Sequence, residues 1–201
     1  IAIKPDHVEA FNNLGSTLKE LGQLDTAVKS YEQVIAINPD FAEAHNNLGV
    51  TLQELGQHDD AVKCFEKALA IKSNYVDVHC SLGISLQELG QHDDAVKYFE
   101  QALAIQPDFA DAHYNLGNAL QDLDQLDEAV KSFEKALAIN PDFAEAHNNL
   151  GITLKELDQL DDAVKSYEKA IAIKSDFAEA HNNLGNAFKD LGQLGAAVKS
   201  Y

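Results

Sequence analysis

Apolar residues recur along the chain in two alternating stripes, each with the spacing of a helix. Leu14, Leu18 and Leu21 are separated by four and three residues, which places them on one face of an amphipathic helix. A second stripe follows, and its members are Ala27, Val28, Tyr31, Val34 and Ile35. The alternation predicts pairs of helices joined by short turns.

Both stripes return every 34 residues, and each copy of the first stripe contains a glycine: Gly15, Gly49, Gly83, Gly117, Gly151 and Gly185. A fixed period of this length is typical of units that cannot bury their own apolar face and therefore stack on their neighbours. We divide the chain into repeats 8–41, 42–75, 76–109, 110–143, 144–177 and a truncated 178–201, with 1–7 as the end of a preceding repeat. The sequence thus predicts an all-α fold, one continuous α-solenoid of stacked antiparallel helix pairs.

Turn residues support the division into helix pairs. A residue suited to left-handed backbone separates the two helices of each pair. These residues are Gly22, Gly56, Gly90 and Gly192, with Asp124 and Asp158 as substitutes that tolerate this backbone less well. Asp25 and its copies are predicted to cap the second helix, and Asp40 with Glu43 reads as a capping box for the next repeat. The mid-helix glycine is predicted to let two helices approach closely.

The charge balance limits the possible partners. The chain has 15 basic residues against 33 acidic ones, a formal net charge of -18, and every basic residue is a lysine. Nucleic acids and anionic membranes both need clustered basic side chains, so we expect neither as a partner. Cys64 and Cys80 occupy non-equivalent places in the repeat, which predicts free thiols rather than a disulfide or a zinc site.

One histidine recurs in most repeats, at His45, His79, His113, His147 and His181. Ligands of one zinc ion lie about 2.0 to 2.1 Å from it, so side chains a whole repeat apart cannot converge on one ion. We expect these histidines to pack between helices, and we expect no metal and no cofactor.

Leu14-Gly15, Leu18, Ala27, Tyr31 and Pro39, with their copies, resemble the pattern of the tetratricopeptide repeat family. The resemblance covers essentially the whole chain. It implies a right-handed superhelix with a concave groove lined by the first helix of each pair. Histidine stands where the family often carries a large aromatic residue, which is present here only as Phe11.

Asparagines dominate the candidate groove. A row stands two residues before the repeated glycine, at Asn13, Asn47, Asn115, Asn149 and Asn183, interrupted by Ser81. Preceding asparagines at Asn12, Asn46, Asn148 and Asn182 join it, with acids at Glu43, Asp77, Asp111 and Glu145. Carboxamides both donate and accept hydrogen bonds, so the row can bind a peptide backbone. The acids can form ion pairs with basic side chains. Alternatively, duplication copied a tolerated asparagine, or the row bonds the backbone of a neighbouring repeat.

Three functions remain open. Enzymes need a unique constellation of reactive groups, whereas these groups recur in rows, so we expect no catalysis. The first hypothesis is a scaffold that binds an extended protein or peptide segment. The second is the substrate-recognition arm of a larger enzyme, because the N-L-G and N-P-D segments are similar to the repeat arm of O-linked N-acetylglucosamine transferases. The third is self-association through uncapped apolar ends.

Overall fold

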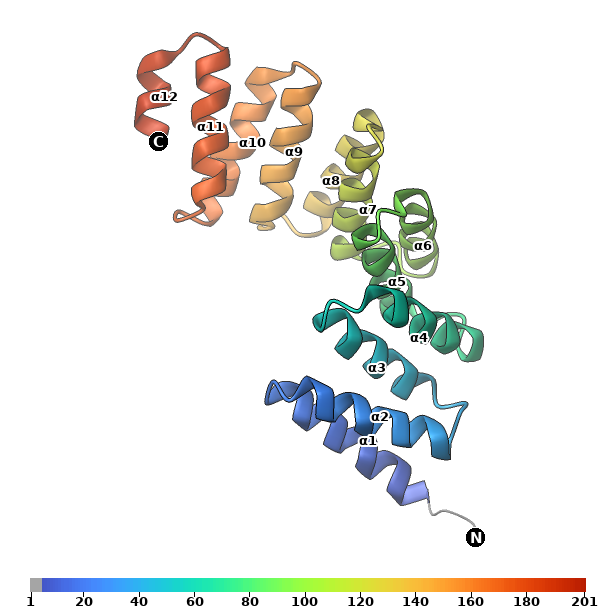
Figure 1. Cartoon of the computed structure of the whole chain (residues 1–201). Coiled ribbons are helices and arrows are strands. Elements are labelled where there is room, and N and C mark those ends of the chain that lie inside the picture. Colours follow the sequence, from blue (N-terminus) through green and yellow to red (C-terminus); the bar gives the residue numbers. More distant parts are fainter. Residues whose placement is uncertain (1–4) are drawn as a thin grey trace. The chain divides into compact units, whose positions relative to one another are not determined.

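The structure is a computed structural model that describes residues 5–201, and it contains twelve helices in that range. The first helices of the pairs are α1 (Pro5–Glu20), α3 (Ala42–Glu54), α5 (Val76–Glu88), α7 (Ala110–Asp122), α9 (Ala144–Glu156) and α11 (Ala178–Asp190). The second helices are α2 (Leu24–Ile37), α4 (His58–Ile71), α6 (His92–Ile105), α8 (Leu126–Ile139), α10 (Leu160–Ile173) and α12 (Leu194–Ser200). Figure 1 shows these helices joined in hairpins.

Two compact units divide the chain, Ile1–Ile105 with α1 to α6 and Gln106–Tyr201 with α7 to α12. Within each unit, every first helix packs on the second helix of its own pair. Each second helix packs in turn on the first helix of the next pair. This sequential packing confirms the predicted all-α solenoid of helix pairs.

The two sets of helices form different sides of each unit. Successive first helices contact one another, α1 with α3 and α3 with α5 in one unit, α7 with α9 and α9 with α11 in the other. Successive second helices make no such contact in the described part of either unit. The first helices therefore form the tighter inner face of a unit, and the second helices diverge on its outer face.

A glycine and an aromatic ring join the two helices of each pair. A Cβ atom placed on Gly117 would lie 2.6 Å from Cε1 of Phe133, and the same clash recurs between Gly15 and Tyr31. Phe133 is completely buried. The predicted close approach at the mid-helix glycine is confirmed, because no side chain fits between the helix and the ring.

Stacking buries the leucine stripe. Leu48 and Leu150 are each 8 % exposed, whereas Leu14, in the first repeat, is 47 % exposed. The difference arises because α2 packs on α3 and α8 packs on α9, whereas no preceding helix packs on α1 in the described part. The sequence assigns residues 1–7 to the end of a preceding repeat; residues 1–4 lie outside the described part, and Pro5 begins α1.

The turn prediction is confirmed inside the helix pairs. Gly22, Gly56, Gly90 and Gly192 all have positive φ, and so do Asp124 and Asp158, at 59° and 60°. These residues end the first helix in the left-handed conformation that glycine adopts without strain.

The capping prediction is wrong. Gln23 is the N-cap of α2 and Phe41 the N-cap of α3, and neither makes a side-chain cap hydrogen bond. Because α2 begins at Leu24, Asp25 lies inside its first turn, where its charge acts on the helix dipole instead. Glu43, the expected partner in a capping box, accepts a hydrogen bond from the preceding repeat.

Candidate peptide-binding surface

The candidate surface is the inner face that the first helices form in each unit. The acids predicted for it are exposed, or half-buried in one case, and they are Glu43, Asp77, Asp111 and Glu145. In the asparagine row, Asn13 is exposed, and the half-buried members are Asn47, Asn115, Asn149 and Asn183. The asparagines that precede the row differ more in burial: Asn12 and Asn148 are buried, Asn46 is half-buried and Asn182 is exposed.

Asn12 connects its own repeat to the following one in unit 1. Its side chain is only 4 % exposed. The Nδ2 of Asn12 donates to Oε1 of Glu43 at 3.1 Å, and its Oδ1 accepts a hydrogen bond from Nδ2 of Asn47 at 3.2 Å. Both partners belong to α3. We name this arrangement the asparagine bridge, and it satisfies a buried amide that would cost about 1–3 kcal/mol if left unpaired.

The same bridge joins α9 to α11 in unit 2. Asn148 is 1 % exposed, its Nδ2 donates to Oε1 of Glu179 at 3.2 Å, and its Oδ1 accepts from Nδ2 of Asn183 at 3.0 Å. The repeated geometry shows that a buried asparagine positions the next helix of the inner face.

A variant of the bridge joins α7 to α9. Tyr114 stands in the place that Asn12 and Asn148 occupy in their repeats. Its hydroxyl accepts a hydrogen bond from Nδ2 of Asn149 at 3.2 Å, and the same nitrogen donates to Oδ1 of Asn118 at 2.9 Å. Both protons of this row amide are therefore used within the unit.

The bridge is interrupted between α3 and α5. Ser81 replaces the row asparagine there, and its short side chain cannot reach back as Asn47 does. The Oδ1 of Asn46 is consequently buried without a hydrogen-bond partner, while its Nδ2 donates to Oδ1 of Asn47 at 3.4 Å. This junction is the least satisfied one on the inner face of unit 1.

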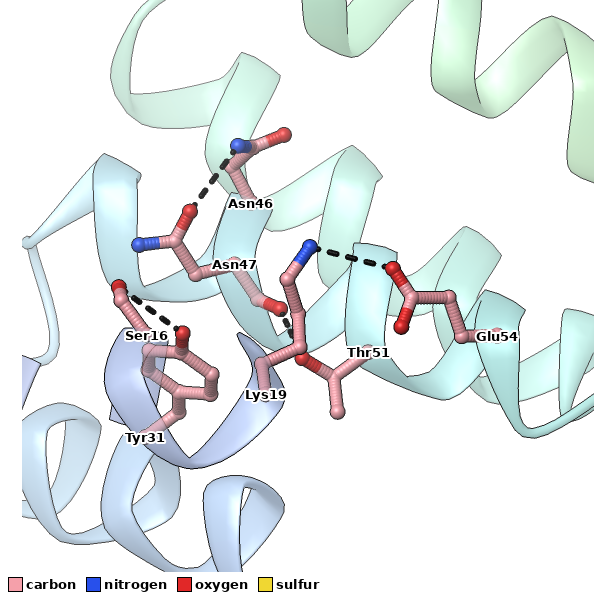
Figure 2. A network of polar contacts seen from close by, with 7 residues as sticks. All are labelled: Ser16, Lys19, Tyr31, Asn46, Asn47, Thr51 and Glu54. Atoms are coloured by element: carbon pink, nitrogen blue, oxygen red, sulfur yellow. Dashed lines mark hydrogen bonds and ion pairs between the residues drawn. The ribbon is translucent and has the colours of Figure 1, made fainter. Parts of the chain in front are cut away.

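Polar residues near the end of the first helices also join neighbouring repeats. Nζ of Lys19 lies 3.1 Å from Oε1 of Glu54, and Nζ of Lys155 lies 3.0 Å from Oδ2 of Asp190. Figure 2 shows the first of these ion pairs beside Asn47. These side chains are partly exposed, so each pair contributes at most about 1 kcal/mol.

The sequence predicts asparagines on the first helices but does not predict the side-chain bridge. One alternative from the sequence is a hydrogen bond from the row to the backbone of a neighbouring repeat, whereas the observed partners are side chains such as Asn12 and Glu43. The signal that could have revealed it is a pair of adjacent asparagines followed, one repeat later, by an acid and another asparagine.

The repeated histidine fixes the turn between repeats. Nε2 of His147 donates to the carbonyl of Pro141 at 3.0 Å, and Nε2 of His113 donates to the carbonyl of Pro107 at 3.0 Å. In both rings the buried Nδ1 has no partner. Burial lowers the pKa of both histidines below the ordinary value, although the hydrogen bond to the carbonyl opposes the shift. Both rings are therefore held neutral.

The described residues contain neither a cluster of metal ligands nor a disulfide. Within residues 5–201, no group of three or more histidine, cysteine, aspartate or glutamate side chains could hold a metal ion. Neither Cys64 nor Cys80 is in a disulfide, and burial raises the pKa of the Cys64 thiol to about 11. No helix of the described part is both long enough and apolar enough to cross a membrane.

Family models place the chain among the tetratricopeptide repeats. Three models described as tetratricopeptide repeat match residues 40–108, 110–143 and 132–165, and one described as TPR repeat matches residues 15–56 and 153–192. The chain is an array of tetratricopeptide repeats and belongs to that family.

Solved structures of the same fold include three close in size. MamA is 25% identical with a TM-score of 0.77, covering 82% of this chain and 96% of that one. YrrB, a TPR protein with an unusual peptide-binding site, is 26% identical with a TM-score of 0.73, covering 85% and 88%. PilW, a type IV pilus biogenesis factor, is 24% identical with a TM-score of 0.87, covering 96% and 90%.

A comparison with curated protein sequences found no match. The similarity to the repeat arm of the transferases therefore stays a prediction. At the level of the class, the family and its structural neighbours support a scaffold for protein interactions.

Proposed function

We propose that the chain is a non-catalytic scaffold whose inner face binds an extended protein segment of basic or neutral character. The observation that carries the proposal is the row of carboxamides that retain hydrogen-bonding capacity beside exposed acids on the first helices. Neighbouring helices lie roughly 10 Å apart, and an extended peptide advances about 3.3 Å per residue. One row asparagine would then meet about every third peptide residue.

The asparagines of the row differ in how many hydrogen bonds they can still form with a guest. In the described part, the side chains of Asn13 and Asn115 make no hydrogen bond, so both can donate and accept freely. Asn47 and Asn183 each use one amide proton in an asparagine bridge and keep the other. Asn149 uses both protons, and its Oδ1 already accepts from Nδ2 of Asn148 at 3.3 Å, so only a second lone pair of that oxygen stays available.

The buried asparagines have a different part in the proposal. Asn12 and Asn148 are almost inaccessible, and their amides bond the next repeat. We assign them the positioning of Asn47 and Asn183, which lie beside them on the inner face. Asn46 and Asn182 are more accessible and complete the proposed set.

Exposed acids supply the electrostatic part of binding. Asp77 and Asp111 are exposed on α5 and α7, and Glu145 is half-buried on α9. Together with the net charge of -18, they favour a guest that carries lysine or arginine. The charged part of the binding free energy should weaken with salt, and the backbone part should persist.

Binding of a labelled peptide tests the proposal. The probe is an extended peptide of about twelve residues in which lysine alternates with alanine and serine. We expect Asn13→Ala to weaken binding to the inner face of unit 1 and Asn115→Ala to weaken binding to that of unit 2, and the double variant to weaken the total binding by about tenfold or more, as measured by fluorescence anisotropy. These two positions are chosen because their loss breaks no bond within the chain.

Matched controls are asparagines in outer turns. Asn74 and Asn140 are exposed between repeats, so Asn74→Ala with Asn140→Ala should leave the affinity unchanged. Unchanged affinity in the double variant of Asn13 and Asn115 would rule out the asparagine row as the binding element.

Self-association is a second candidate, favoured by exposed apolar side chains on the terminal repeats. Leu14 and Leu21 are 47 % and 67 % exposed on α1 and the turn after it, and Val198 is 76 % exposed on α12. Exposed apolar surface of this kind favours association with a matching face. Light scattering over a dilution series tests it, and a monomer at every concentration would count against it.

A further inference from the structure

A pocket opens between the second helices α8 and α10 of unit 2, away from the inner face. Its volume is about 660 Å³. His147 lies in its lining, together with the apolar side chains of Leu137, Leu150 and Ile173. The pocket lies where the second helices α8 and α10 diverge.

The chain itself contains a smaller version of this pocket in unit 1, which an aromatic side chain partly occupies. The equivalent hollow between α4 and α6 is smaller, about 370 Å³, and is lined by His79 and Tyr98. The ring of Tyr98 packs on that of His79, with ring centroids 6.0 Å apart and an interplanar angle of 32°. An aromatic ring is therefore compatible with the space beside the repeated histidine.

Ser166 leaves that space open in unit 2. It follows His147 at the same distance in sequence as Tyr98 follows His79. The side chain of Ser166 is 7 % exposed, and its Oγ donates to the carbonyl of Asp162 on its own helix at 3.0 Å. The serine thus turns toward its helix backbone and contributes little volume to the pocket.

The charged residues around this site favour an occupant that is not an anion. Nδ1 of His147 is buried without a partner, and so is Nδ1 of His79 beside Tyr98, so the ring contact rather than this nitrogen defines the site. Glu134, Asp142 and Lys169 are the charged residues of the lining, which gives one negative charge in excess. A phenol or an indole has an aromatic face and one donor, and it carries no negative charge.

We propose that the pocket beside His147 binds a tyrosine or tryptophan side chain of a protein partner, in the place that Tyr98 takes beside His79. The site lies on the second helices, so it does not depend on the asparagine row of the first helices. A partner could use the two surfaces separately.

Side-chain analogues test the proposal on the whole chain. We would titrate p-cresol and indole and follow the ring resonances of His147 and nearby amide resonances by NMR. The expected result is saturable shifts around His147, with Ser166→Tyr weakening the affinity by at least about tenfold. Tyr98→Ser should create a new binding site beside His79. Both substitutions copy residues that the other repeat already has, so the fold should be retained, as thermal unfolding would verify.

Cyclohexanol is the matched control, since it has similar size and a hydroxyl but no aromatic face. Binding of cyclohexanol as strong as that of p-cresol would overturn the aromatic assignment. Absence of shifts near His147, or shifts that survive in Ser166→Tyr, would overturn the site itself. Neither result would bear on peptide binding by the inner face.

Discussion

At the scale of single residues, the aromatic ring opposite the mid-helix glycine leaves no room for a larger residue at that position. We expect Gly117→Ala to lower the free energy of unfolding by about 1–2 kcal/mol. Alanine would gain about 1 kcal/mol in helix propensity, but its Cβ would lie 2.6 Å from the buried ring of Phe133. Overpacking of this kind costs about 1–3 kcal/mol or more. Urea unfolding measures the difference.

Gly195 offers the matched control for this substitution. It also lies in a helix, α12, but a Cβ placed there would have no atom within 4 Å. Gly195→Ala should therefore leave stability unchanged or raise it. If Gly117→Ala proved as harmless as Gly195→Ala, close packing against Phe133 would not limit this position.

Ser81 is the second residue whose effect can be predicted. We expect Ser81→Asn to raise the free energy of unfolding by about 1 kcal/mol, because its amide can donate to the buried Oδ1 of Asn46 and complete the missing asparagine bridge. Serine and asparagine have similar helix propensities, so this term changes little. Chemical denaturation checks the prediction.

Two further variants isolate the bridge. In an Asn46→Ala background the gain from Ser81→Asn should vanish, since the acceptor is absent. The reverse change, Asn47→Ser, should lower stability, because it removes the donor that Asn12 uses. A gain from Ser81→Asn that survives without Asn46 would contradict the explanation.

At the scale of the elements, the repeated histidine ties the turn between two helix pairs to the first helix that follows. His113 and His147 have lowered pKa values because burial disfavours the charged ring. In the unfolded chain they would protonate near their ordinary value of about 6.5. The unfolded state therefore binds more protons below that pH, and the stability that these histidines contribute is present above it and is lost as the pH falls.

The test compares urea unfolding at neutral pH with unfolding about one unit below the ordinary histidine pKa. We expect the double variant His113→Gln with His147→Gln to lose less stability over this interval than the original chain does. Glutamine can still donate toward the carbonyls of Pro107 and Pro141 but does not titrate. Equal losses in the two proteins would assign the pH effect to other groups.

At the scale of the whole molecule, the net charge of -18 opposes folding. We expect the free energy of unfolding to rise as sodium chloride shortens the Debye length from about 30 Å to about 8 Å. Potassium chloride should act equally, because screening does not depend on the cation. A stability that stayed constant or fell over this range would show that local ion pairs, such as Lys19 with Glu54, outweigh the general repulsion.

The repeat itself was predictable because it depends on local patterns. The helical spacing of Leu14 and Leu18, a glycine or aspartate in left-handed conformation at each first helix end and a glycine opposite each ring all follow from steric rules that act within one repeat. Asp124 and Asp158 were likewise predicted in the left-handed region and are found there. The helix caps were not, because a shift of one or two residues in a helix start moves an aspartate out of the capping position.

The candidate site was predictable only in part. The sequence placed the asparagines on first helices. Asn12 and Asn13 are neighbours in sequence, yet Asn12 is buried in an asparagine bridge and Asn13 is exposed. Which of two adjacent amides meets the next repeat depends on the rotation and spacing of packed helices. The pocket beside His147 was also invisible, since it arises from the divergence of α8 and α10 and from the size of Ser166.

The sequence by itself determined the helix pairs, their turns and their order of stacking, because hydrophobic period and backbone conformation act over a few residues. Only the tertiary structure decided which polar groups form hydrogen bonds between repeats and which stay available for a partner. Hydrogen bonds such as that from Asn47 to Asn12 form only when two helices lie at a fixed distance and rotation.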